Sequence, residues 1–177
     1  MKLEIHFEDN FNFGYDVVDA IADTTPDKTA LVWCNTENEE HIFSFADIKL
    51  LSNKTANVLK NAGIKRGDKV LAVLKRHFEY WTVAVALHKL GATLIPATHM
   101  LTVNDLVYRL KSSKAKAVIC TTQNEAPEKI LSAVREAGSS CKLWTVQNTV
   151  DSFENLSEQI ALADDNFERV ETHYTDP

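Results

Sequence analysis

Three short polar stretches in this sequence contain side chains that could bind a ligand. In the first, Lys75-Arg76-His77, the arginine presents a rigid fork of hydrogen-bond donors that suits a phosphate or a carboxylate. The helix expected directly after it would add the partial positive charge of its N-terminus. This stretch therefore indicates anion binding, and the alternative is an ordinary solvated turn.

The second stretch is Thr98-His99-Met100-Leu101-Thr102, which follows a proline that stiffens the preceding strand. Thr98 and His99 could line a ligand path, since histidine can exchange protons close to neutral pH. The alternative is a turn that leads into a helix cap. The third stretch, residues 121–124, is polar but indicates no particular chemistry. Four basic residues are predicted to form a solvated face and loop rather than an anion site: Arg109, Lys111, Lys114 and Lys116.

The sequence lacks the usual loops for phosphate and acyl-transfer chemistry. It contains neither GxxxxGK[ST] nor GxGxxG, and its five glycines are too far apart to form one backbone nest for a triphosphate. It also lacks the GxSxG elbow of α/β-hydrolases. By its own residues, the chain is predicted to be a scaffold without a catalytic centre.

The three cysteines, Cys34, Cys120 and Cys141, are far apart and form no CxxC pair. This usage favours reduced thiols and a cytoplasmic protein. Cys34 and Cys120 lie in predicted buried strands, whereas a nucleophilic thiolate needs exposure and positive surroundings. A cysteine hydrolase that pairs one of them with His99 is therefore disfavoured. The six histidines show no metal-ligand spacing, and no metal site is predicted.

Length and composition indicate one globular domain. The chain has 177 residues, of which 45% are hydrophobic and 25% are charged. No apolar run approaches the roughly 18 residues that span a bilayer, so no membrane partner is predicted. Charged residues within Met1–Asn10 stand where an export signal needs an apolar core, so no export signal is predicted.

The net charge of −6 is unevenly distributed. Residues 151–177 contain eight acidic residues and one arginine, which gives −7 and leaves +1 for residues 1–150. Because a nucleic-acid-binding protein needs a basic face, no nucleic-acid partner is predicted. The acidic tail is interpreted as a solvated surface stretch, and the alternative is an interaction segment.

Strand-like apolar runs alternate with segments of helical spacing along most of the sequence. This alternation predicts an α/β fold with a mainly parallel sheet, helices on both faces and an N-terminal antiparallel hairpin. Since ligands of open α/β sheets bind beyond the carboxyl ends of the strands, the three polar stretches are expected at the ligand-binding edge. The predicted strands are 28–35, 40–45, 69–75, 93–97, 115–121 and 141–146, and the predicted helices are 15–22, 45–62, 78–90, 103–112, 125–137 and 152–162.

Two short motifs, Phe43–Ile48 (FSFADI) and Leu87–Pro96 (LHKLGATLIP), occur in this order and are followed by a third similar stretch, Asp105–Lys116. In their order and spacing they resemble the opening part of AMP-forming acyl-CoA synthetases, within the adenylate-forming superfamily. The third stretch is especially similar to the medium-chain, butyryl-type branch. The resemblance extends over residues 11–177.

This resemblance implies an incomplete N-terminal domain of the adenylate-forming fold. Residues 1–163 would be its α/β part, and residues 164–177 would lead toward a nucleotide loop that the sequence does not contain. The full-length enzyme would use ATP, Mg²⁺ and CoA to convert a carboxylic acid to acyl-CoA, AMP and pyrophosphate. The partner of the chain would be the remainder of its own polypeptide. Because the family's nucleotide loop, ribose-binding aspartate and catalytic lysine have no counterpart here, the chain alone is predicted to be inactive.

The resemblance also implies a CoA-side role for Thr98, His99 and Met100. In relatives, the matching segment lies near the channel through which the pantetheine arm of CoA reaches the acyl-adenylate. A polar residue is common at the position of Met100 in the medium-chain branch, so a backbone contact would survive here and a side-chain contact would not. A different interpretation remains open, a freestanding α/β binding or interaction module with an acidic C-terminal tail.

Overall fold

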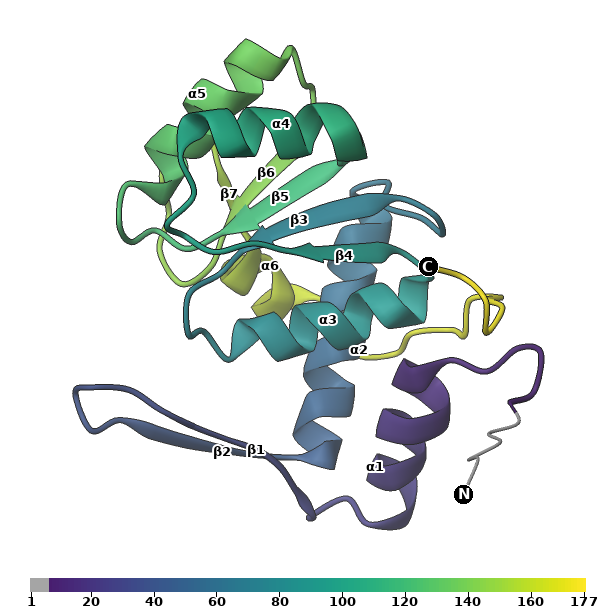
Figure 1. Cartoon of the computed structure of the whole chain (residues 1–177). Coiled ribbons are helices and arrows are strands. Elements are labelled where there is room, and N and C mark those ends of the chain that lie inside the picture. The colour runs from purple at the N-terminus through teal and green to yellow at the C-terminus, as the bar shows by residue number, and fades with distance from the viewer. Residues whose placement is uncertain (1–6) are drawn as a thin grey trace, which may run out of the picture.

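The computed structural model describes residues 7–177 and has the predicted alternation of strands and helices (Figure 1). The prediction that no export signal is present rests partly on residues 1–6, which lie outside the described residues. In chain order the elements are η1 (Gly14–Asp19, π-helical), α1 (Ala20–Thr24), β1 (Thr29–Cys34), β2 (Glu40–Ser44), α2 (Phe45–Asn61), β3 (Lys69–Val73), α3 (Glu79–Leu90), β4 (Thr93–Pro96), α4 (Val103–Ser113), β5 (Ala117–Cys120), α5 (Ala126–Ala137), β6 (Lys142–Thr145), β7 (Glu154–Asn155) and α6 (Leu156–Leu162).

Five strands form one parallel sheet in the order β4-β3-β5-β6-β7. Helices α4 and α5 cover one face of this sheet, and α2, α3 and α6 lie on the other (Figure 1). The predicted fold class is therefore confirmed. None of the helices within residues 7–177 is long and apolar enough to cross a membrane.

The two central strands, β3 and β5, are buried on both faces of the sheet. All four residues of β5 and four of the five in β3 are buried, which agrees with their continuous apolar sequences. Alternate side chains enter opposite cores: Val70 and Ile119 pack toward α2 and α3, whereas Leu71 and Val118 pack toward α4 and α5.

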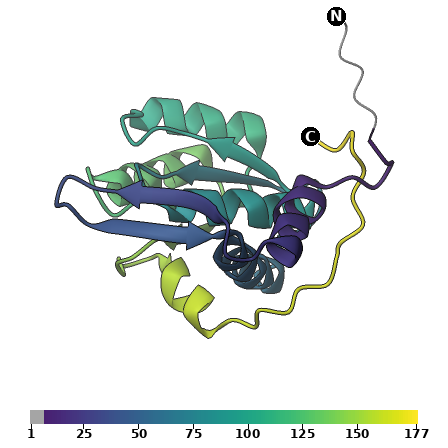
Figure 2. The same ribbon diagram turned by 90° about the horizontal axis from the view of Figure 1, so that it is seen from below.

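Strands β1 and β2 form a separate antiparallel hairpin that projects from the body, as Figure 2 also shows. Trp33 and Phe43 on one face of the hairpin contact Phe78, which precedes α3. The other face is open to solvent, and this explains why Cys34, predicted to be buried, is exposed. The hairpin continues directly into α2, which begins with a capping box of Ser44 and Asp47.

The predicted helix over 152–162 is shorter than expected, because its first residues form strand β7. Glu154 and Asn155 pair in parallel with Trp144 and Thr145 of β6. The side chain of Asn155 then accepts a hydrogen bond from the amide of Glu158 at 3.2 Å and caps α6. A strand of two residues is too short to show a period of two in the sequence.

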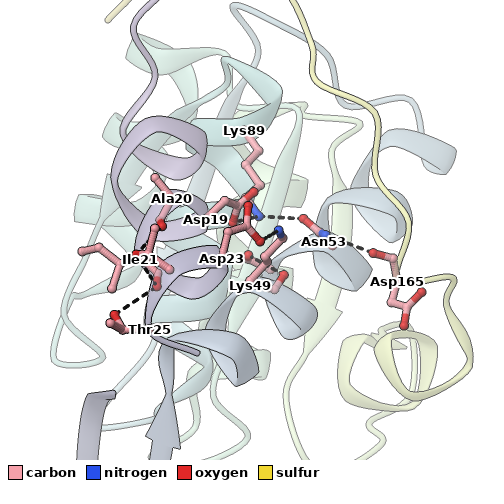
Figure 3. A network of polar contacts seen from close by, with 11 residues as sticks. Asp19, Ala20, Ile21, Asp23, Thr25, Lys49, Asn53, Lys89 and Asp165 are labelled. Atoms are coloured by element: carbon pink, nitrogen blue, oxygen red, sulfur yellow. Dashed lines mark hydrogen bonds and ion pairs between the residues drawn. The ribbon is translucent and has the colours of Figure 1, made fainter. Parts of the chain in front are cut away.

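A buried lysine joins four parts of the chain (Figure 3). The Lys89 side chain on α3 is fully buried, and its Nζ donates to Asp19 Oδ1 at 2.7 Å and to Asn53 Oδ1 at 2.6 Å. Asn53 on α2 in turn donates through Nδ2 to the carbonyl oxygen of Asp165 at 3.0 Å. Burial lowers the pKa of Lys89, and its hydrogen bond to Asp19 opposes that shift. A Cβ at Gly14 would lie 2.7 Å from Lys89 Cγ, so glycine makes room for the lysine stem.

The C-terminal segment, residues 164–177, follows an extended path from α6 toward η1 (Figure 2). Phe167 and Thr172 are buried, as are Phe153, Asn155, Leu156 and Ile160 before them, so the interpretation of 151–177 as a solvated stretch is wrong for these residues. Arg169 Nη1 lies 2.6 Å from Asp16 Oδ1, and Arg66 Nε lies 2.7 Å from Asp176 Oδ2. These contacts hold the segment on the body, and the domain division at residue 163 stays a prediction.

Candidate functional site

The three polar stretches lie at the carboxyl edge of the parallel sheet, after β3, β4 and β5. The chain passes from β3 to β4 on one side of β3 and then returns to β5 on its other side. The strand order therefore changes direction between β3 and β5. Crevices at such switch points are the usual ligand sites of open α/β sheets.

The structure joins the first and third stretches across this switch point. His77 Nε2 lies 2.8 Å from Thr121 Oγ1, and both residues are buried. A second contact joins the same two stretches, since Lys75 Nζ donates to Gln123 Oε1 at 3.4 Å. These contacts connect the ends of two neighbouring strands. They could not be derived from the sequence, because strand order was not predicted.

A buried carboxylate stands behind His77. Glu79 Oε2 lies 3.9 Å from His77 Nδ1 and has no hydrogen-bond partner among the described residues. Burial raises the pKa of Glu79, and burial, together with the charge of Lys75, lowers the pKa of His77. Sequence reasoning missed Glu79, because an acidic residue in the first turn of a helix is ordinary.

A pocket of about 460 Å³ opens between the end of the hairpin and the switch point. The indole N–H of Trp33 donates to the carbonyl oxygen of Arg76 at 2.5 Å and ties the two walls together. The lining contains two cations, Lys75 and Arg76, and one acid, Glu37, so the charge of the walls is partly balanced. Anion binding by this stretch stays a prediction. The lining residues are Cys34, Asn35, Thr36, Glu37, Lys75, Arg76, His77 and Gln123.

The stretch assigned to the CoA side, Thr98, His99 and Met100, forms a turn after the edge strand β4. The amide of Met100 donates to Thr98 Oγ1 at 3.3 Å, and the Met100 side chain is 75% exposed. His99 is half-buried. None of the three lines the pocket at the switch point. Their CoA-side role stays a prediction.

The cysteines do not support a hydrolase. Burial raises the pKa of the Cys120 thiol to about 12, which keeps it protonated. Cys34 is exposed, and among residues 7–177 no cysteine is hydrogen-bonded to a histidine. Within the same residues, no group of three or more His, Cys, Asp or Glu side chains is arranged to hold a metal ion.

The buried His77 predicts a pH-dependent stability. Because its pKa is lowered in the fold, acid favours the unfolded chain, and stability present above pH 6.5 is lost as the pH falls. Between pH 7.5 and 5.5 the free energy of unfolding of His77→Gln is expected to fall by about 1 kcal/mol less than that of the wild type. Urea unfolding at the two pH values measures the difference. Glu79, whose pKa is raised by burial, acts in the opposite direction, and it is present in both proteins that are compared.

Thr121→Val serves as the control for this titration, because it removes the hydrogen bond of His77 but leaves the imidazole in place. This variant is expected to be less stable at every pH and to keep most of the wild-type pH dependence. Equal pH dependence in His77→Gln and the wild type would contradict the prediction.

Comparison with known proteins identifies similar sequences and folds. The profile of the family described as AMP-binding enzyme matches residues 18–177. Human acyl-coenzyme A synthetase ACSM3, mitochondrial, is 37% identical and is matched over 94% of this chain and 29% of its own length. Mouse ACSM4, mitochondrial, is 35% identical and is matched over 95% of this chain and 30% of its own length. The chain thus spans less than a third of these relatives.

Solved structures with a similar fold are also acyl-CoA-forming enzymes by name. The crystal structure of Brucella canis acyl-CoA synthetase has a TM-score of 0.81 at 22% identity, over 94% of this chain and 30% of that one. A benzoate CoA ligase from Burkholderia xenovorans LB400 has a TM-score of 0.72 at 22% identity, over 86% of this chain and 29% of that one. At this identity the likeness concerns the fold.

Two expectations from the sequence are decided by these relatives. The match over residues 18–177 favours the synthetase interpretation over a freestanding module. The cytoplasmic location was wrong, since the similar synthetases are named as mitochondrial. That prediction used reduced thiols and the missing apolar export core, and neither feature detects mitochondrial targeting, which uses amphipathic rather than apolar segments.

Proposed function

This chain belongs to the AMP-binding enzyme family, and from that membership we propose that it acts as the N-terminal part of an AMP-forming acyl-CoA synthetase. The observation that carries the proposal is the sequence identity of 37% and 35% to two mammalian acyl-coenzyme A synthetases over nearly the whole chain. In the proposed reaction, a carboxylic acid and ATP give an acyl-adenylate and pyrophosphate. The thiol of CoA then displaces AMP and forms acyl-CoA, a step of fatty-acid metabolism.

The residues of this chain do not fit ATP and Mg²⁺ by themselves. Transfer to ATP places negative charge on the departing pyrophosphate, which needs loop amides, a cation and a metal to stabilise it. The sequence has no glycine-rich loop, and residues 7–177 contain no cluster of metal-ligating side chains. We therefore derive no adenylation step from this chain and assign that chemistry to the longer polypeptide.

We propose that this chain forms one wall of the channel through which CoA reaches the acyl-adenylate. The turn at Thr98 is held by its own backbone, since its carbonyl oxygen accepts from the amide of Leu101 at 3.4 Å. It leaves the side chain of Met100 in solvent and the turn itself open to an arriving pantetheine arm. A contact through the backbone of Met100 and the half-buried side chain of His99 agrees with this exposure.

The proposal is tested by comparing this chain with the complete polypeptide. Each is incubated with ATP, Mg²⁺, CoA and butyrate, and pyrophosphate is measured. The complete polypeptide is expected to release pyrophosphate only when the carboxylic acid is present, and residues 1–177 alone are expected to match a buffer blank. Pyrophosphate release by residues 1–177 would contradict the assignment of adenylation to the longer polypeptide. If the complete polypeptide released no pyrophosphate with any carboxylic acid, the proposed synthetase function would be wrong.

The CoA-side assignment is tested in the same assay by following acyl-CoA. His99→Ala in the complete polypeptide is expected to raise the KM for CoA by roughly fivefold, the loss of about one hydrogen bond, and to leave pyrophosphate release unchanged. Met100→Ala is the matched variant and is expected to have little effect, because its side chain points into solvent. An unchanged KM for CoA in His99→Ala would remove His99 from the proposed wall.

A further inference from the structure

The side-chain amide of Asn53 lies between buried Lys89 and the backbone of the C-terminal segment (Figure 3). An ammonium group has donors only, so Lys89 requires the amide oxygen of Asn53 on its own side. The amide N–H of Asn53 is then left to face the C-terminal segment, where it meets the carbonyl oxygen of Asp165. The lysine thus determines which end of the amide the segment encounters.

A second amide lies one turn further along α2. Asn57 Nδ2 is 2.8 Å from the carbonyl oxygen of Asp164 and 2.9 Å from that of Asn166. Residues four apart lie on the same face of a helix, so the two asparagines contact three successive carbonyl groups of the segment. Because backbone carbonyls are bound, the contact does not depend on the acidic side chains of the segment.

The lysine also reaches the segment through Tyr15 of η1. The Tyr15 hydroxyl donates to the carbonyl oxygen of Lys89 at 3.2 Å and accepts from the amide of Val170 at 3.1 Å. Beside it, the guanidinium of Arg169 lies 4.9 Å from the Tyr15 ring centroid and pairs with Asp16. The contacts from α2 and η1 therefore meet the segment at both ends of the stretch 164–170.

We propose that Lys89 and Asn53 are positioning residues that dock the C-terminal segment on α2 and η1. The docked segment fixes where the polypeptide leaves this domain. The next step rests on the proposed function, in which the nucleotide loop follows this segment in the complete polypeptide. Lys89 and Asn53 then position the ATP site without touching ATP. They act through the backbone of residues 164–170, and neither of them lines the switch-point pocket.

Docking is tested in the 177-residue chain by trypsin. Arg169 is the only lysine or arginine in residues 151–177, so cleavage after it releases the peptide 170–177. Asn53→Asp keeps an acceptor for Lys89 but, when ionised at pH 8, has no donor for Asp165. The loss of one buried hydrogen bond is expected to speed release of the peptide roughly tenfold, measured by mass spectrometry, because cleavage follows the open population.

Asn61→Asp is the matched control, because it adds the same charge to the exposed surface of α2 and has no hydrogen bond to the segment among the described residues. It is expected to cleave at the wild-type rate. Should Asn53→Asp fail to fold by circular dichroism, Asn57→Asp replaces it, since Asn57 is only half-buried and loses both of its donors. Release of the peptide at the wild-type rate by the folded variant would overturn the docking role.

The link to ATP is tested in the complete polypeptide. Asn53→Asp is expected to raise the KM for ATP roughly tenfold and to leave the KM for CoA unchanged, whereas simple loss of folded enzyme would lower kcat alone. Faster cleavage with an unchanged KM for ATP would overturn positioning of the ATP site but not docking. An inactive wild-type polypeptide would instead overturn the proposed function, and the trypsin result would stand by itself.

Discussion

Lys89→Met is expected to lower the free energy of unfolding by about 3–5 kcal/mol, the usual effect of removing one partner from a buried ion pair. Methionine fills most of the space of the lysine stem, so the loss measures charge and hydrogen bonding rather than a cavity. Asp19 would keep a buried carboxylate without a cation, and Asn53 Oδ1 would lose its donor. Urea unfolding at pH 7.5, followed by circular dichroism, measures the change.

Two further variants distinguish the contribution of the Lys89–Asp19 ion pair from the general effect of replacing a lysine. In the double variant Lys89→Met with Asp19→Asn, no unpaired carboxylate is left, so the losses of the single variants are expected to be non-additive by roughly 0.5–3 kcal/mol. Lys111→Met on α4 is the control, because this exposed lysine is expected to change stability by less than about 0.5 kcal/mol. A Lys89→Met variant as stable as that control would contradict the prediction.

The same variant carries a pH signature with a definite sign. Burial already raises the pKa of Asp19, and the loss of Lys89 removes the group that opposes this shift. A carboxyl whose pKa is raised in the fold binds its proton more tightly there, so acid stabilises the folded state relative to the unfolded one. The loss in Lys89→Met is therefore expected to be smaller at pH 5 than at pH 7.5.

Features of the fold that depend on local sequence could be predicted. The apolar run over 69–73 and the short run over 117–120 became the central strands, because a strand buried on both faces needs no polar alternation. Ser44 and Thr102 each begin a helix with an aspartate three residues later, and both capping boxes are present. The parallel class followed from the alternation of strands and helices.

Features that depend on strand order could not be predicted. The contact between His77 and Thr121 exists because β5 lies next to β3, which no local pattern specifies. Cys34 was predicted to be buried, because an apolar run gives no sign that its strand belongs to a two-stranded hairpin with an open face.

Lys89 was missed for a different reason, although the sequence contained a signal. A lysine in the last turn of a helix normally stays in solvent, where it interacts favourably with the helix dipole. However, Val85 and Ala86 stand four and three residues before it and are both buried. The helical period therefore places the lysine on the apolar face of α3, and a charge on that face requires a buried partner.

Trp144→Ala is expected to lower the free energy of unfolding by about 3–5 kcal/mol, as deletion of a buried aromatic side chain usually does. Trp144 is fully buried on β6, and its indole N–H donates to Gln159 Oε1 of α6 at 3.0 Å. On the adjoining strand it is paired with Glu154 of β7. The side chain therefore connects α6 to the core that contains α2 and α3, and the backbone of the same residue pairs with β7, a strand that the sequence did not predict.

Trp144→Phe is the matched variant for this position, because it keeps a large aromatic ring and loses the indole N–H. It is expected to lose about 1–2 kcal/mol, and urea unfolding by circular dichroism compares the two variants. Hydrogen exchange over residues 156–162 then shows whether α6 opens with the rest of the domain or before it. A loss below about 1 kcal/mol in Trp144→Ala would mean that β6, β7 and α6 are not part of the cooperative core. The edge of the sheet beyond β5 would then be an appendage, and the C-terminal segment would depend on α2 and η1 alone for its position.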